Sequence, residues 1–269
     1  MTHSQYHILH SRGEVTFLDS VVREAGQRVL ELIREGFEVM IKPDSSQVTT
    51  ADLAVDQLLK DHVHKAYPQD GWLSEESPDD RQRLKKTRVW ILDPIDGTRN
   101  FISQIPQYAI SMALVEDEEP VIGMIFNPAT DEMFLAMKDD GAFFNEQPIS
   151  GKSTSSERVT CLANLSNNQR RRLQELAPTI EVQPFGSIAC ALALQAAGRA
   201  DIMLNPGNQN EWDIAAGVLM IQEAGGIVHD RHGQPIRFNQ PTPTTQGVIA
   251  TRPDLTETVE RLLDILDAT

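Results

Sequence analysis

The order of apolar patterns predicts an α+β fold in which helices form layers on β-sheets. Two helical patterns open the chain and a run of alternating apolar segments follows them. The second half then alternates strand and helix patterns. Such elements bury their apolar sides by packing helices on sheets. The 269 residues suffice for one large domain or two closely packed subdomains.

Two helices are expected before the first sheet. Apolar residues recur at helical spacing within 17–37, and a polar link at 42–47 separates this helix from the next. The second helix follows Val48, with Thr49 or Thr50 as its N-cap, because a hydroxyl there can accept a hydrogen bond from the first turn. Its expected inward-facing residues are Leu53, Leu58, Leu59 and Val63.

The remaining elements follow from alternation and from turn residues. Acidic or Asn-Pro turns separate the central apolar segments, which is typical of an antiparallel meander. Strands of the first half are expected at 71–77, 88–92, 109–115, 120–126, 132–137 and 141–149. The second half is expected to hold strands at 158–162, 181–184, 201–204, 226–229 and 247–251, and helices at 168–175, 187–197, 213–224 and 253–267. The best candidate for a subdomain boundary is 150–157, which divides the chain into subdomains 1–150 and 151–269.

Composition and charge narrow the classes of function. The chain is 40% hydrophobic and 23% charged, as in ordinary globular proteins, and its formal net charge is −15. Because nucleic acids and anionic membranes need a basic surface, neither is an expected partner. Residues 1–15 lack the apolar core of a signal peptide, so a cytoplasmic location is expected. Cys161 and Cys190 lie in apolar surroundings and are expected to be buried, reduced thiols.

The segment 90–101, WILDPIDGTRNF, carries the strongest chemical signal. It places Asp93 and Asp96 at the exit of a buried strand, where two carboxylates are costly unless a positive charge lies between them. Mg²⁺ prefers carboxylate oxygens of this kind. Gly97 permits a tight turn in which the N–H groups of Gly97 and Thr98 can point at a phosphate. The chemistry indicated is metal-assisted attack on a phosphate ester.

Three further acidic positions accompany this pair. Asp52 and Asp213 stand at the starts of predicted helices, and Glu75 stands at the end of a predicted strand. Taken singly, each has a structural interpretation, because an acid in the first turn complements the helix dipole and Glu75 can belong to a solvated turn. Taken together, the acids form a constellation suited to holding metal ions around a phosphate.

Two signature blocks, 90–101 and 212–226 (WDIAAGVLMIQEAGG), occur in this order. Supporting blocks are VTTAD at 48–52, SEES at 74–77, GAFFN at 141–145, GSIA at 186–189 and AAGRAD at 196–201. In these blocks the chain resembles the inositol monophosphatase superfamily of metal-dependent, lithium-sensitive phosphatases, over nearly its whole length. The resemblance implies a layered αβαβα sandwich of the sugar-phosphatase type, with mixed and antiparallel sheets covered by helices. Residues 1–150 would carry the metal and phosphate site, and 151–269 would complete it as one catalytic unit.

The resemblance also implies a role for each site residue, and thus a phosphoric monoester hydrolase that uses metal-activated water. Two or three Mg²⁺ ions would be held by Glu75, Asp93, the carbonyl of Ile95, Asp96 and Asp213, with Asp93 bridging two of them. Thr98 would hydrogen-bond the attacking water and interact with Asp52. Glu75 would help to accept the proton of that water. Contacts to the phosphate or substrate would come from Gly97, Thr98, Gly186, Ser187, Ile188 and Asp213.

The sequence leaves several phosphate esters open as the small-molecule substrate. Inositol monophosphatases commonly place a glutamate seven residues before the aspartate of the Trp-Asp block, to hold sugar hydroxyls. That position is Pro206 here, and Glu211 is too close to replace it. The run 42–52, KPDSSQVTTAD, resembles 3′(2′),5′-bisphosphate nucleotidases, whereas RNF at 99–101 has the Asn-Phe form typical of inositol and histidinol phosphate enzymes. Inositol monophosphate is expected first and the bisphosphonucleotide second, ahead of histidinol phosphate and sugar bisphosphates.

A regulatory, partner-binding module is the alternative from another class of function, because some superfamily members act in this way. The intact acidic set disfavours it, since unused carboxylate clusters are electrostatic liabilities. The resemblance further implies inhibition by lithium and a homodimer.

Overall fold

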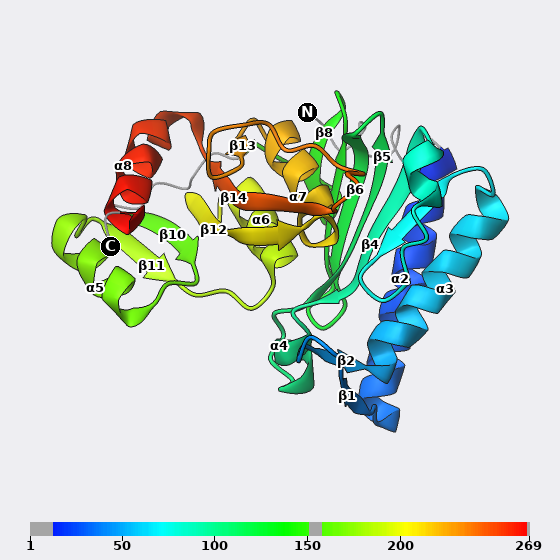
Figure 1. The fold of residues 1–269 in the computed structure, drawn as a ribbon. Coiled ribbons are helices and arrows are strands. Elements are labelled where there is room, and N and C mark those ends of the chain that lie inside the picture. The colour runs from blue at the N-terminus through cyan, green and yellow to red at the C-terminus, as the bar shows by residue number, and fades with distance from the viewer. Residues whose placement is uncertain (1–12, 151–157, 268–269) are drawn as a thin grey trace.

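The computed structural model describes residues 13–150 and 158–267, in which helices and β-sheets alternate as layers (Figure 1). The helices are α2 (Gly13–Glu35), α3 (Thr50–Ala66), α4 (Thr98–Ile102), α5 (Asn167–Leu176), α6 (Ile188–Ala196), α7 (Glu211–Glu223) and α8 (Thr256–Asp267), and short 3-10 helices lie at Gln82–Lys85 and Pro253–Leu255. The larger sheet contains β3 (Gly71–Ser74), β4 (Arg88–Asp96), β5 (Ala109–Glu116), β6 (Glu119–Asn127), β7 (Glu132–Met137), β8 (Gly141–Phe144) and β9 (Gln147–Ile149). The smaller sheet contains β10 (Val159–Ala163), β11 (Ile180–Gln183), β12 (Ile202–Asn210), β13 (Ile227–His229) and β14 (Thr244–Thr251), and a separate hairpin pairs β1 (Val39–Ile41) with β2 (Gln47–Thr49).

The larger, seven-stranded sheet has the order β3-β4-β5-β6-β7-β8-β9. β3 and β4 run parallel, and the other neighbours run antiparallel. Side chains alternate between the two faces, so that Trp90 and Leu92 pack with α2 and α3 while Val89 and Ile91 pack with α6 and α7. The predicted antiparallel meander of the first half is therefore confirmed. Its strands are apolar on both sides because helices cover both faces.

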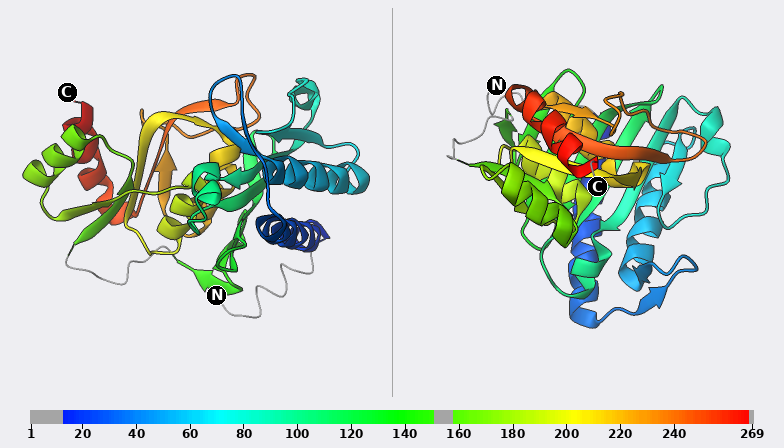
Figure 2. Two further views of the ribbon diagram at one scale, coloured as in Figure 1. Left: turned by 90° about the horizontal axis from the view of Figure 1, so that it is seen from below. Right: turned by 60° about the vertical axis from the view of Figure 1, so that its left-hand side comes forward.

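The smaller, five-stranded sheet has the order β11-β10-β12-β14-β13, with β10 parallel to both of its neighbours and β14 antiparallel to both of its own. Leu173 of α5 and Leu262 of α8 pack on one face. Helices α6 and α7 lie between the two sheets (Figures 1 and 2), and α7 is buried continuously from Ile214 to Ile221 because it contacts both. The layers run α2/α3, large sheet, α6/α7, small sheet, α5/α8, which confirms the predicted αβαβα sandwich.

The hairpin β1–β2 was not expected from the sequence. The polar run at 42–47, interpreted as a link, contains its turn, and strands of three residues are too short to show alternation. Short helix α4 was also missed, because a single turn leaves no periodic pattern. Leu53 is 42% exposed rather than inward, since α3 turns Val55, Leu59 and Val63 toward the core instead.

Two strands continue well past their predicted C-terminal ends. β4 continues through Asp96 instead of ending at Leu92, and β12 continues to Asn210 instead of ending at Leu204. In each, irregular pairing with the neighbouring strand, between Asp93 and Asp96 in β4, accommodates residues typical of turns.

Several smaller expectations can be compared directly. Thr49 is the N-cap of α3, as predicted. Both cysteines are free; Cys161 is buried, but Cys190 is only half-buried. Across the described residues, we find no helix with the length and apolar character needed to cross a bilayer. Most of the expected boundary at 150–157, together with residues 1–12, lies outside the described part of the chain.

Candidate metal and phosphate site

The predicted site residues converge on one cavity of about 430 Å³, near the ends of β3 and β4 and the first turns of α4, α6 and α7. Its lining consists of Ser46, Gln47, Glu75, Asp93, Ile95, Asp96, Gly97, Thr98, Arg99, Gly186, Ile188, Asn210 and Asp213. Two predicted residues, Asp52 and Ser187, are not in the lining but contact residues that are. The volume suits a small organic phosphate.

Three carboxylates form the candidate metal centre. One oxygen each from Glu75, Asp93 and Asp213 lies within 4.8 Å of the other two. Burial, followed by the charges of nearby carboxylates, raises the pKa of Asp93 and that of Asp213 well above the ordinary value. A divalent cation would relieve this repulsion, and converging carboxylate oxygens are the donors that Mg²⁺ and Ca²⁺ prefer. The residues therefore fit such an ion.

Asp96 has a second set of contacts. Its Oδ2 accepts hydrogen bonds from the Ser187 hydroxyl and, at 2.6 Å, from the N–H of Ala189 in the first turn of α6. Burial raises the pKa of Asp96 to about 6, although both hydrogen bonds oppose this. Asp96 thus joins the end of β4 to α6 and lines the same cavity as the three converging carboxylates without belonging to that group. Its role as a metal ligand stays a prediction.

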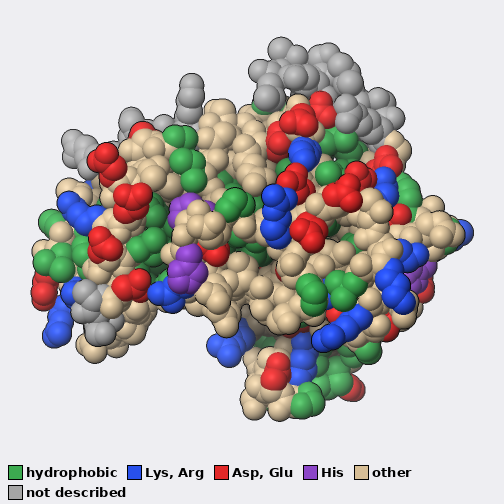
Figure 3. Space-filling view, turned by 45° about the horizontal axis from the view of Figure 1, so that its top comes forward, with side chains coloured by type: hydrophobic (Ala, Val, Ile, Leu, Met, Phe, Trp, Pro, Cys, Tyr) green, Lys and Arg blue, Asp and Glu red, His purple; other side chains and the backbone are tan. Residues whose placement is uncertain are grey.

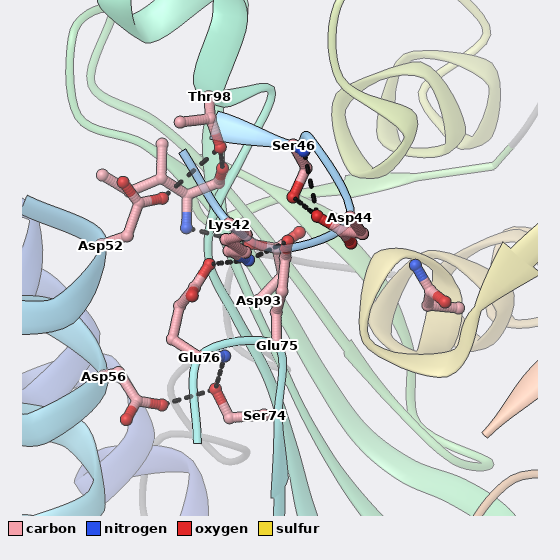
Figure 4. A network of polar contacts seen from close by, with 12 residues as sticks. Lys42, Asp44, Ser46, Asp52, Asp56, Ser74, Glu75, Glu76, Asp93 and Thr98 are labelled. Carbon is pink, nitrogen blue, oxygen red and sulfur yellow. Dashed lines mark hydrogen bonds and ion pairs between the residues drawn. The ribbon is translucent and has the colours of Figure 1, made fainter. Parts of the chain in front are cut away.

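The Thr98 hydroxyl points toward the carboxylate of Asp52 (Figure 4). Its hydroxyl is 3.1 Å from the carbonyl oxygen of Ile95 and 3.4 Å from Oδ1 of Asp52. The other oxygen of Asp52 accepts from the N–H and the hydroxyl of Thr49, at 2.8 and 2.6 Å, which completes the capping box of α3. Burial raises the pKa of Asp52 to about 6. The helix cap therefore fixes a carboxylate whose free side faces the Thr98 hydroxyl.

Glycines allow two backbone segments to meet at the cavity wall. Gly97 has a φ of 92°, and a Cβ there would lie 2.8 Å from the carbonyl oxygen of Gln107 and 3.1 Å from that of Gly186. A Cβ on Gly186 would collide with the side-chain amide of Asn100. The predicted phosphate-binding backbone at 97–98 is therefore held against the start of α6 by contacts that only glycine permits.

Lys42 is a functional candidate that the residue patterns did not single out. Its ammonium nitrogen lies 2.9 Å from Oε1 of Glu75 and 2.6 Å from Oε1 of Glu76 (Figure 4). Burial lowers the pKa of Lys42, but hydrogen bonds to both carboxylates outweigh it and raise the pKa overall. Burial raises the pKa of the Glu76 carboxyl to about 7, although its hydrogen bond with Lys42 opposes this. The hairpin β1–β2 brings Lys42 to these acids, and that hairpin was not predicted.

Known proteins of one family are similar to this chain over most of its length. The model of the inositol monophosphatase family matches residues 13–267. The chain belongs to the inositol monophosphatase family. It is 31% identical over 247 residues to the inositol-1-monophosphatase of Bacillus subtilis, covering 88% of this chain and 91% of that protein. It is 32% identical over 231 residues to the Nus factor SuhB of Xylella fastidiosa, covering 81% and 82%. Among solved structures, an IMPase of Thermotoga maritima superposes with a TM-score of 0.83 at 27% identity, covering 96% and 99%.

This inositol monophosphatase family member lacks an acid for sugar hydroxyls at the expected place. Pro206 occupies that position, within the irregular part of β12. Glu211 does not substitute for it, because its carboxylate accepts hydrogen bonds from the N–H groups of Asn239 and Gln240, at 2.6 and 2.8 Å. Burial raises the pKa of Glu211 to about 7. Neither Pro206 nor Glu211 lines the cavity. Among the described lining residues, the acidic ones are the four that are predicted to bind metal.

Charged side chains of both signs lie on one face of this family member. On the face shown in Figure 3, Asp and Glu side chains are interspersed with Lys and Arg, and the described residues form no continuous basic patch there. That nucleic acid is not a partner stays a prediction from the formal net charge of −15.

Proposed function

We propose that this chain is a Mg²⁺-dependent phosphomonoesterase that hydrolyses a small phosphate monoester, such as inositol monophosphate, with water as the nucleophile. The observation that carries the proposal is the convergence of Glu75, Asp93 and Asp213 beside the paired side chains of Thr98 and Asp52. Family membership supports phosphate ester hydrolysis as the reaction class.

Two or three Mg²⁺ ions would be held by Glu75, Asp93, the carbonyl of Ile95, Asp96 and Asp213. When bound, they would neutralise the phosphate, lower the pKa of the attacking water and stabilise the leaving alkoxide. Thr98 would orient the water through its hydroxyl oxygen while donating its own proton to Asp52. With a pKa of about 6, Asp52 is mostly ionised near pH 7 and can accept that hydrogen bond. Glu75 would help to take up the water proton.

The phosphate would lie against the backbone at 97–98. The N–H groups of Gly97 and Thr98 would donate to its oxygens, and the start of α6 at 186–188, together with Asp213, would contact the rest of the substrate. We further propose that residues 1–150 carry the metal site and residues 151–269 complete it, as one catalytic unit. Inhibition by lithium, a homodimer and a cytoplasmic location belong to the same proposal.

The test is release of inorganic phosphate in Mg²⁺, with and without lithium. Inositol 1-phosphate, 3′,5′-bisphosphoadenosine, histidinol phosphate and fructose 1,6-bisphosphate are compared as substrates. Asp93→Asn should abolish turnover of every ester, because it removes the most buried carboxylate of the metal centre. Asp264→Asn on α8, an exposed carboxylate with the same change of charge, is the control and should keep full activity. Equal activity of the two variants would contradict the proposal.

A regulatory module is the second candidate, because one relative is called a Nus factor. The same variants separate the two functions. A binding module should keep its biological function when Asp93→Asn removes turnover, whereas an enzyme should lose it. Absence of phosphate release from all four esters, with Mg²⁺ binding demonstrated by calorimetry, would favour the module.

A further inference from the structure

Among the described residues that line the cavity, Arg99 is the one cation. It follows Thr98 in the first turn of α4, where its backbone carbonyl accepts the N–H of Ser103 at 3.1 Å. Its side chain is exposed. Within the described residues we find no hydrogen bond or ion pair of its guanidinium, although four carboxylates line the same cavity. Arg99 is therefore a lining residue whose charge none of the described side chains neutralises.

A guanidinium without a partner at this place favours an anionic group of the substrate. Arginine stays protonated at all relevant pH values, and its planar set of donors matches phosphate and carboxylate oxygens. The four lining carboxylates are assigned to metal binding, so the reacting phosphate is accounted for without Arg99. An anion attached elsewhere on the substrate is the natural partner of this side chain.

The other walls favour the same conclusion. Apart from Arg99 and the four lining carboxylates, the described residues of the lining are uncharged, and they include Ser46, Gln47 and Asn210. No acid for sugar hydroxyls is among them, since Pro206 stands at the usual position and Glu211 binds the backbone at 239–240. The part of the substrate outside the reacting phosphate thus meets amides, a hydroxyl and one cation.

We propose that Arg99 makes the site selective for phosphate monoesters that carry a second anionic group, a phosphate or a carboxylate, over esters that carry hydroxyls alone. This inference rests on the proposed phosphatase function, and within that function it places esters with a second anion ahead of inositol monophosphate, whose remaining groups are hydroxyls. Both sugar bisphosphates and bisphosphonucleotides have the required chemistry.

The test compares substrates that differ by one phosphate. Fructose 1,6-bisphosphate is paired with fructose 1-phosphate, and 3′,5′-bisphosphoadenosine with 3′-AMP, so that the two pairs distinguish the sugar from the nucleotide. In the unmodified protein, kcat/KM for the preferred bisphosphate should exceed that of its monophosphate partner about tenfold, between the effect of an exposed ion pair and that of a bidentate Arg–phosphate contact. The gain should appear mainly in KM, because a remote anion contributes to binding in the ground state and the transition state alike.

Variants of Arg99 assign the preference to this side chain. Arg99→Gln should bring the bisphosphate-to-monophosphate ratio close to one, and Arg99→Lys should restore part of it, because lysine keeps the charge and loses the planar donors. Arg171→Gln, an exposed arginine on α5 with the same loss of charge, should leave the ratio unchanged. A ratio near one in the unmodified protein, or an equal loss for both members of a pair in Arg99→Gln, would overturn the inference.

Binding measurements separate this inference from the proposed function. Calorimetric titration of each pair in Ca²⁺, which takes the same oxygen ligands as Mg²⁺, reports affinity independently of turnover. A protein that releases no phosphate but binds one bisphosphate about tenfold more tightly than its partner, through Arg99, would retain the inference and lose the phosphatase. Equal affinities for both members of each pair would overturn the inference even if all four esters were hydrolysed.

Discussion

Raising the pH from 5 to 8 in a chelator should destabilise this protein. Burial raises the pKa values of several carboxyls at and near the metal centre, including Asp52 and Asp96, each to about 6, and Glu211, to about 7. A carboxyl with a raised pKa in the folded state stabilises the fold fully below its unfolded pKa. It loses that contribution as the pH rises through its folded pKa. The window for loss therefore runs from about pH 4 to pH 7.

The magnitude follows from the shifts. Between pH 5 and their folded pKa values of about 6, Asp52 and Asp96 each lower the free energy of unfolding by about 1.4 kcal/mol. Glu211 contributes about 3 kcal/mol over the same range, because its pKa is higher. One kcal/mol corresponds to about 2–4 °C for a protein of this size, so Tm should fall by at least about 10 °C. Asp93 and Asp213, whose pKa values are raised well above the ordinary range, shift in the same direction.

Mg²⁺ should offset part of this loss, and mainly at high pH. A ligand present at a hundred times its Kd stabilises the folded state by about 2.7 kcal/mol. At pH 5 protons compete for the same carboxylates, so the gain should be smaller there. The assay is thermal unfolding followed by circular dichroism at pH 5, 6.5 and 8, with chelator or with millimolar Mg²⁺.

Two variants test whether the carboxylates of the metal centre cause the loss of stability with pH. Asp93→Asn should raise Tm in chelator at pH 8 and remove the gain from Mg²⁺, whereas Asp264→Asn should behave like the unmodified protein. The carboxyls whose pKa values are lowered, such as Asp254 beside Arg252, finish ionising below this range and cannot produce the effect. A Tm in chelator that stays flat or rises from pH 5 to 8, or a gain from Mg²⁺ that is equal at both ends, would refute the reasoning.

Three further substitutions have defined outcomes. Gly97→Ala should lower the free energy of unfolding by about 1–3 kcal/mol, because φ is 92° and the new Cβ would meet the Gln107 carbonyl oxygen; an unchanged urea midpoint would contradict this. Thr98→Val should lower kcat by about 10²–10⁴-fold, whereas Thr98→Ser should stay within about tenfold of the unmodified protein, so equal kcat values would remove the hydroxyl from the mechanism. Arg83→Met should cost about 3–5 kcal/mol in urea unfolding, because the buried guanidinium binds Asp79 and the carbonyl oxygen of Gln240, and a loss below 1 kcal/mol would show that this network matters little.

Prediction of the fold from the sequence succeeded where a pattern is long. The helix at 17–37 and the central strands have enough periodic positions to specify both type and burial, so their existence was predicted and confirmed. The hairpin β1–β2 and the helix α4 were missed because elements of three to five residues contain no full period. The extensions of β4 and β12 were missed because proline and asparagine there are typical of turns, and only the neighbouring strand converts them into irregular pairing.

The sequence by itself determined which residues are predicted to carry the chemistry. The acids at 52, 75, 93, 96 and 213 stand at ends of elements, and their types already indicate a metal and a phosphate. Only the tertiary structure decided how they are arranged. It brings Glu75, Asp93 and Asp213 together, turns one oxygen of Asp96 toward α6 and brings Lys42 to Glu75. It leaves the Arg99 side chain without a partner in the part of the chain that the structure describes. The reason is that residue type fixes the functional groups locally, whereas distances between them depend on how distant strands and helices pack.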